Sequence, residues 1–246
     1  MKLFGLTDIG LVRRDNQDSY AIRVLDDELA IAVVCDGMGG ALAGNVASAV
    51  AVEAFAAALE DACREGIPPD RERKQELLRS ACRTANAQVF KLSAHNPEYR
   101  GMGTTLVAAL ILSHEVYIVN VGDSRCYLLR GGELKQLTLD HSVVQTLVNN
   151  GSITPEQART HPRKNLITRA VGIEDKVESD LYHFDRQEGD VILLCSDGLS
   201  NVVDVTSLAE LLTCHPDPEE CCRALLARAV EQGAPDNVTA VVAQLS

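Results

Sequence analysis

The pattern of hydrophobic and polar positions predicts two long helices early in the chain. Apolar side chains recur at helical spacing through the Ala-rich run 43–64, and again through 70–94, where Arg, Lys and Glu fill the remaining positions. Gly66-Ile67-Pro68-Pro69 separates the two runs. Each helix is therefore expected to cover one side of an apolar layer.

Short apolar runs separated by turn residues predict strands. An apolar run at Ala30–Cys35 comes before the helices. Four more strands follow them, at 104–112, 115–121, 124–130 and 133–137. Their tight turns favour an antiparallel meander over βαβ units. The remaining expected elements are strands at 178–184, 191–196 and 237–244 and helices at 206–214 and 218–232.

The order of these elements predicts an α+β fold. Helices grouped in pairs around antiparallel strands favour a central antiparallel β-sandwich flanked on both faces by helix pairs, an αββα arrangement. The polar segment 140–172 contains two prolines and is expected to be an irregular excursion with short helices at most. No repeat or linker divides the chain, so a single domain over residues 1–246 is expected.

Composition excludes several classes of function. The 246 residues carry a formal net charge of −12, contain no Trp and have few aromatic residues, which argues against binding to nucleic acid or anionic membranes. No signal peptide or membrane-spanning run is evident, and the eight cysteines form no C-x-x-C pair. We therefore expect a cytoplasmic protein with reduced, packed thiols and no zinc cluster.

Acidic residues recur at the ends of the predicted strands. An Asp-Gly alone is compatible with a solvated turn. Here, however, five aspartates stand directly before or after strands: Asp18, Asp36, Asp123, Asp197 and Asp236. Because the end of one antiparallel strand lies beside the start of its neighbour, these five side chains are expected to meet at one end of the sandwich.

Clustered carboxylates without nearby histidines favour Mg²⁺ or Mn²⁺. Two such ions can share a bridging water and direct it as hydroxide at phosphorus, and glycines let a backbone carbonyl approach a metal. The competing signatures H-E-x-x-H, G-x-x-x-x-G-K-[ST], G-x-S-x-G and the thiol-phosphatase loop are absent. Cys35 and Cys195, beside two of the acids, are expected to be core residues rather than nucleophiles.

Six motifs in order along the chain resemble those of the metal-dependent protein phosphatases of the PPM or PP2C type, in their compact bacterial form. They are Arg13-x-x-Asn16-Gln17-Asp18, Asp36-Gly37-Met38-Gly39-Gly40, Gly101-Met102-Gly103-Thr104-Thr105, Val121-Gly122-Asp123-Ser124-Arg125, Ser196-Asp197-Gly198 and Asp236-Asn237-Val238-Thr239. The resemblance implies hydrolysis of phosphoserine and phosphothreonine in proteins by a metal-bridging hydroxide.

The resemblance also implies the site residues. Two Mn²⁺ or Mg²⁺ ions would be held by Asp36, the Gly37 carbonyl, Asp197 and Asp236, with Asp18 contributing directly or through water. A third, weaker ion would be held by Asp123 together with Asp197. Arg13 would bind the substrate phosphate, whereas the neighbouring Arg14 is expected to be a solvated charge. The segment 140–172 corresponds to the family's flap, and its Arg and Lys residues would meet an acidic phosphoprotein surface.

Two departures from the family pattern leave questions open. Gln17 stands where relatives commonly have an acid. Met38 stands where eukaryotic relatives have a His proposed as proton donor, so a metal-bound water or another group must serve. His141 is one candidate, although it is expected instead to be a surface or flap histidine. The alternatives are the same chemistry on another phosphorylated substrate, or an inactive relative that binds a partner. A Ser/Thr kinase is an expected partner, and a monomer is expected.

Overall fold

The computed structural model describes residues 1–40 and 43–245, so residues 41–42 and 246 of the predicted domain lie outside the described part. The strands are β1 (Lys2–Asp8), β2 (Asp18–Val24), β3 (Ala30–Met38), β4 (Gly103–Thr104), β5 (Leu106–Ile111), β6 (Glu115–Val121), β7 (Arg125–Arg130), β8 (Glu133–Gln136), β9 (Asp180–Asp185), β10 (Val191–Cys195) and β11 (Val238–Gln244). The helices are α1 (Ala43–Glu65), α2 (Arg71–His95), the 3₁₀ turn Pro97–Tyr99, α3 (Val143–Asn149), α4 (Pro155–Arg159), α5 (Asp197–Ser200), α6 (Val205–Cys214) and α7 (Pro218–Glu231).

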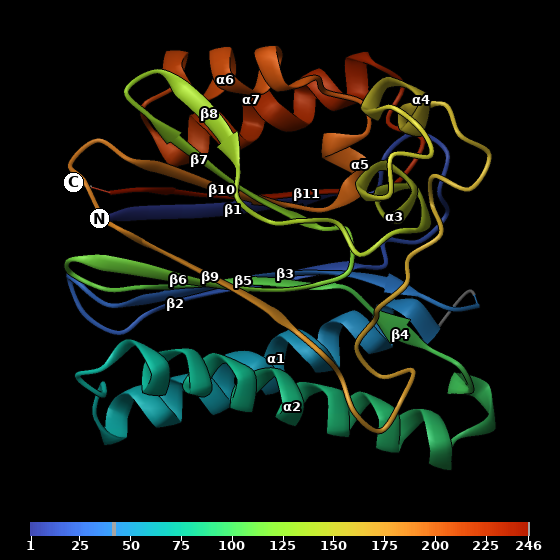
Figure 1. Ribbon diagram of the computed structural model, residues 1–246, viewed down its shortest axis with the longest axis horizontal. Coiled ribbons are helices and arrows are strands. Elements are labelled where there is room, and N and C mark those ends of the chain that lie inside the picture. Colours follow the sequence, from blue (N-terminus) through green and yellow to red (C-terminus); the bar gives the residue numbers. More distant parts are fainter. Residues whose placement is uncertain (41–42, 246) are drawn as a thin grey trace.

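Two antiparallel sheets form the centre of the molecule. One has the order β1-β11-β10-β7-β8, and the other has the order β2-β3-β5-β6-β9, with the short β4 paired to β3. Figure 1 shows the sheets face to face, with α6 and α7 outside the first and α1 and α2 outside the second. The predicted αββα sandwich is therefore confirmed.

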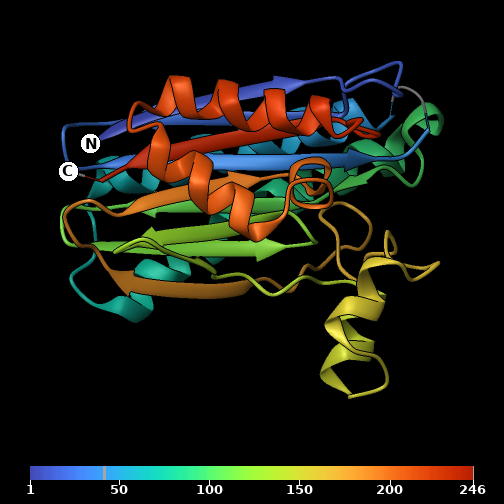
Figure 2. The ribbon, with the colours of Figure 1, turned by 90° about the horizontal axis from the view of Figure 1, so that it is seen from above.

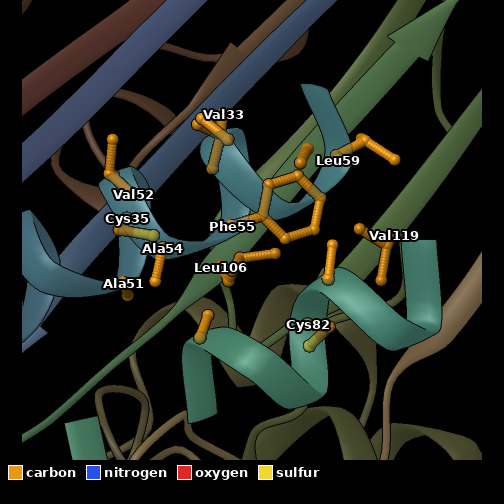
Figure 3. Close-up of a cluster of buried hydrophobic side chains, with 14 of the residues drawn as sticks. Val33, Cys35, Ala51, Val52, Ala54, Phe55, Leu59, Cys82, Leu106 and Val119 are labelled. Carbon is orange, nitrogen blue, oxygen red and sulfur yellow. The ribbon is translucent and has the colours of Figure 1, made fainter. Parts of the chain in front are cut away.

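Apolar side chains fill each interface between layers. Phe55 of α1 lies among Val33, Leu106 and Val119 of the underlying sheet, with Cys82 of α2 close by (Figure 3). A second cluster lies beneath α6 and α7, and a third lies between the sheets. Both long helices begin and end within a residue of their predicted bounds because their apolar spacing is regular, and the Asp70 side chain caps α2 by accepting from the Arg73 N–H.

The predicted meander is wrong at its centre. β5 pairs with β6, and β7 pairs with β8, but β6 and β7 belong to different sheets. Gly122 and its neighbours therefore form a crossing between the sheets rather than a hairpin. The predicted strand 104–112 is also divided, because Thr105 leaves the ladder between β4 and β5.

The segment 140–172, called the flap segment below, projects from one end of the sandwich. It contains only the short helices α3 and α4, as predicted, and Figure 2 shows it in yellow, standing away from the sheets. Both chain termini lie at the opposite end of the sandwich (Figure 1). In the described part of the chain, no helix has the length and apolar character needed to cross a membrane.

Candidate metal centre

Asp18 and Asp36 are brought together by the pairing of β2 with β3. The register places the two residues directly opposite each other, at the start of β2 and near the end of β3. Asp18 is 7% exposed, and its Oδ2 accepts hydrogen bonds of 2.7 Å from both Ser196 Oγ and Thr239 Oγ1 of the other sheet. These hydroxyl groups orient the carboxylate across the gap between the sheets.

Asp197 and Asp236 approach the same place from the other sheet. Asp197 follows β10 as the first residue of α5, and Asp236 stands two residues before β11, the neighbour of β10. Gly198 is required between them, because a Cβ there would lie 1.9 Å from the carbonyl oxygen of Asn237. The side chain of Asn201, one turn along, donates to Asp197 Oδ2 over 2.9 Å.

Asp123 joins the cluster because the chain crosses between the sheets beside it. Gly122 has φ +105°, and a Cβ at that residue would lie 2.6 Å from Thr105 Cγ2. After it, Asp123 is buried, and Ser124 Oγ lies 2.7 Å from Thr105 Oγ1. Thr105 Oγ1 also accepts from the Asp36 N–H, so one hydroxyl group links the chain segments that carry two of the acids.

The electrostatics of these carboxyl groups are unfavourable without a cation. Burial, followed by repulsion from neighbouring carboxylates, raises the pKa of Asp18 to about 7 and that of Asp123 to about 8. The same two causes raise the pKa of Asp36 well above its ordinary value. Burial and then repulsion from Asp236 also raise the pKa of Asp197. Five predicted acids therefore interact at one end of the sandwich.

The donor set fits hard divalent cations. All of the acids offer carboxylate oxygens, and Asp18 Oδ1 is buried without a hydrogen-bond partner, as an oxygen reserved for a cation would be. Gly37 lies between them with no room for a side chain, since a Cβ would be 2.0 Å from the Gly44 carbonyl oxygen. Among residues 1–40 and 43–245, no group of three His, Cys, Asp or Glu side chains is arranged to hold a metal ion as it stands. The fit therefore rests on the chemistry of the carboxylate donors and on the unpartnered oxygen of Asp18.

Arg13 reaches this cluster from the loop between β1 and β2. Its Nη2 lies 2.6 Å from Asp236 Oδ2, and its side chain is 53% exposed. The hydrogen bond to Asp236 raises the pKa of Arg13, with smaller contributions from Asp36 and Asp197. The exposed position leaves the guanidinium free to turn toward an anion that enters the site.

Several polar residues near the acids belong to the sequence motifs, but the sequence alone assigns them no role. Asn237 is one of them. Its Oδ1 accepts from the Gln17 N–H, and its Nδ2 donates to the carbonyl oxygens of Ile9 and Asp15. It thereby holds the loop that carries Arg13 against the start of β11. Three side chains on distant segments do similar work, Thr105, Ser196 and Thr239, and no local pattern distinguishes them from ordinary strand residues.

The structure also places the two residues that depart from the family pattern and the two cysteines beside the acids. Gln17 packs against Gly44 at the start of α1, and its carbonyl oxygen accepts from the Gly37 N–H. Met38 lines a groove of about 500 Å³ together with Ile173 and the end of the flap segment. Cys35 and Cys195 are fully buried core residues, and burial raises both thiol pKa values, that of Cys195 to about 12, so neither is an activated nucleophile.

The sequence profile named "Protein phosphatase 2C" matches residues 13–235. The chain belongs to the protein phosphatase 2C family. Serine/threonine phosphatase stp of Listeria monocytogenes is 40% identical over 239 residues, which cover 97% of this chain and 93% of that one. The predicted family, and with it the predicted class of protein phosphatase, is thereby confirmed.

Solved structures agree with the sequence matches. The crystal structure of the Mycobacterium tuberculosis phosphatase PstP/Ppp is 40% identical and superposes with a TM-score of 0.89, covering 100% of this chain and 98% of that one. A structure of the PstP catalytic domain in complex with two manganese ions is 39% identical, with a TM-score of 0.84 and coverage of 98% and 96%. The two manganese ions bound by that relative agree with the divalent metal expected from the acids.

Proposed function

We propose that this 2C-family phosphatase hydrolyses phosphoserine and phosphothreonine in proteins at the acid cluster described above. The proposed ligands of two core ions are Asp36, Asp197, Asp236 and the Gly37 carbonyl, with Asp18 contributing directly or through water. Asp123 and Asp197 would hold a third, weaker ion. The observation that carries this proposal is the group of carboxylates whose pKa values are raised by burial and by one another. Two cations of the described residues act on the group, the exposed Arg13, which is bonded to Asp236, and Arg125, which is paired with Asp140.

Divalent cations, when bound, supply the positive charge and the activated water that phosphoester hydrolysis needs. The chain's own residues provide the frame. Ser196 and Thr239 hold Asp18, and Thr105 holds the backbone of Asp36. Arg13 would exchange its bond to Asp236 for two parallel hydrogen bonds to the substrate phosphate.

Hydrolysis assays on two substrates test this proposal. With Mn²⁺ present, the enzyme is expected to release phosphate from a phosphothreonine peptide and from p-nitrophenyl phosphate, and EDTA should abolish both reactions. Hydrolysis of p-nitrophenyl phosphate alone would favour a small phosphoester as the substrate. No hydrolysis of either would indicate a partner-binding role. Iodoacetamide inactivation against which phosphate protects would contradict the metal mechanism.

Further properties follow from the same proposal. Residues 1–246 would act as one phosphatase domain, monomeric and cytoplasmic, with the flap segment beside the substrate. The net charge of −12 supports protein rather than nucleic-acid partners. A Ser/Thr kinase and its substrates are the proposed partners. A phosphoproteome compared with and without the enzyme would identify them, and light scattering would measure the molecular mass.

A further inference from the structure

His141 stands at the start of the flap segment and is hydrogen-bonded on both ring nitrogens. The Gly122 N–H donates to Nδ1 over 3.0 Å, and Nε2 lies 3.1 Å from Asp180 Oδ2. Because Nδ1 accepts a hydrogen bond, the ring proton belongs on Nε2, which faces Asp180 Oδ2. Arg169 Nη1, which is itself bonded to Asp180, lies 3.2 Å from the same nitrogen. The residue is 6% exposed, so neither nitrogen is presented to solvent.

The same group of contacts joins the two ends of the flap segment. Asp180 on β9 also accepts from Arg169 Nη1 over 2.8 Å, and Arg169 lies close to the end of the segment. The Thr168 N–H donates to the His141 carbonyl oxygen over 2.8 Å. His141 and Arg169 thus meet on one carboxylate, which closes the base of the flap segment.

His141 makes hydrogen bonds to both backbone polar groups of Gly122. Besides accepting the Gly122 N–H, it donates its own backbone N–H to the Gly122 carbonyl oxygen over 2.9 Å. Asn120 Nδ2 contacts the same carbonyl and that of Leu139, each at 3.3 Å. Gly122 is the residue at which the chain crosses between the sheets, and Asp123 comes directly after it.

We propose that His141 is a positioning residue for Asp123, which it fixes through the Gly122 peptide and links to closure of the flap base. The inference rests on the proposed function, in which Asp123 holds the third ion. It also argues against His141 as the proton donor that replaces the missing family histidine, since its two ring nitrogens are engaged with Gly122 and Asp180.

Two isosteric substitutions separate the two contacts of the ring. The amide oxygen of Asn can take the place of Nδ1, so His141→Asn retains an acceptor for the Gly122 N–H. The amide nitrogen of Gln can take the place of Nε2, so His141→Gln retains the bond to Asp180 and leaves the Gly122 N–H unpaired. His183→Gln is the matched control, because His183 on β9 contacts Glu115 and Asp185 and not the flap segment.

Calorimetric Mn²⁺ titration is the deciding measurement, with kcat on a phosphothreonine peptide measured alongside. His141→Gln should bind the third ion about fivefold or more weakly, as expected for an unpaired buried donor, while the two core ions are unchanged. His141→Asn should restore most of that affinity, and His183→Gln should match the wild type. Each variant is compared at a temperature below its melting transition.

Three outcomes would overturn the inference. Wild-type affinity for the third ion in His141→Gln, with that affinity lost in Asp123→Asn, would show that His141 does not position Asp123. An equal, large fall in kcat at saturating Mn²⁺ in both His141 variants, with normal metal binding, would show that His141 transfers the proton. If Asp123→Asn itself leaves the third ion unchanged, the proposed role of Asp123 fails, and this inference fails with it.

Discussion

Two aspartates flank the same strand, β10, and have opposite surroundings. Asp190 comes directly before the strand and is 1% exposed. Both of its oxygens accept from Arg130, with Nε–Oδ1 and Nη2–Oδ2 distances of 2.8 and 2.6 Å. Asp197 comes two residues after Cys195, the last residue of the strand, and its strongest electrostatic neighbour is another carboxylate, Asp236.

The difference extends to the two ends of the sandwich: the terminal end, which carries both chain termini, and the site end, which carries the acid cluster. At the terminal end, burial raises the pKa of Glu115, but hydrogen bonds from Lys74 and Tyr117 outweigh that effect, and the pKa is lowered. At the site end, burial and like charges raise the pKa of Asp123 to about 8. At the terminal end the chain's own cations neutralise the acid, whereas at the site end repulsion between carboxylates dominates, and this is where we propose that external cations bind.

The largest expected effect is the loss of activity when Asp197, the aspartate that follows β10, is replaced. Asp197→Asn should lower kcat on a phosphothreonine peptide by about 10²–10³-fold or more, because a main electrostatic element of the site is lost. Folding should be retained, since one member of a repelling group loses its charge. Steady-state kinetics and the melting temperature test both parts. A folded variant with a near-normal rate would refute the assignment.

The same substitution at the other end of β10 should act on stability instead. Asp190→Asn removes the charge that pairs with Arg130 and should lower the free energy of unfolding by about 2 kcal/mol. The rate per folded molecule should be unchanged. Urea unfolding and an active-site titration measure these two quantities. Loss of activity without loss of stability would show that the two ends are not divided by function.

Arg13 tests whether the exposed cation serves the substrate or the acid cluster. Arg13→Ala should lower kcat/KM by about 10- to 150-fold, as expected for a lost charge-assisted bond to phosphate. Mn²⁺ titration should look normal, and Arg14→Ala is the matched control. A variant that loses metal ions but keeps its affinity for inorganic phosphate would assign Arg13 to the metal site.

The smallest expected effect is the pH dependence of the metal-free protein. Asp18 has a pKa of about 7 in the folded state, above its value in the unfolded chain, so the folded state binds more protons between these values. The free energy of unfolding should therefore fall as pH rises from about 4 to 7. Each kcal/mol lost should lower Tm by about 2–4 °C. Asp18→Asn should flatten part of this slope, and Mn²⁺ should reduce it in the wild type. A metal-free Tm that rises steadily over this range would contradict the raised pKa.

Much of the fold could be predicted because its signals are local. The regular apolar spacing of α1 and α2 and the acids at the strand ends are visible in the sequence. The crossing at Gly122 was missed because a turn glycine followed by an aspartate is the same in a hairpin and in a passage between sheets. The tie from His141 to Gly122 and Asp180 depends on contacts between segments far apart in the chain, as does the bond between Arg13 and Asp236. Periodicity carries no information about such contacts.

Mn²⁺ binding by calorimetry, measured in two buffers of different ionisation enthalpy, tests most directly whether external cations neutralise the acid end. At pH 7 the wild type and Asp190→Asn should each bind two ions tightly and release protons from the carboxyl groups whose pKa values are raised. Asp36→Asn should lose tight binding and most of the proton release. Equal Mn²⁺ uptake by Asp36→Asn and the wild type, or uptake without any release of protons, would contradict the account.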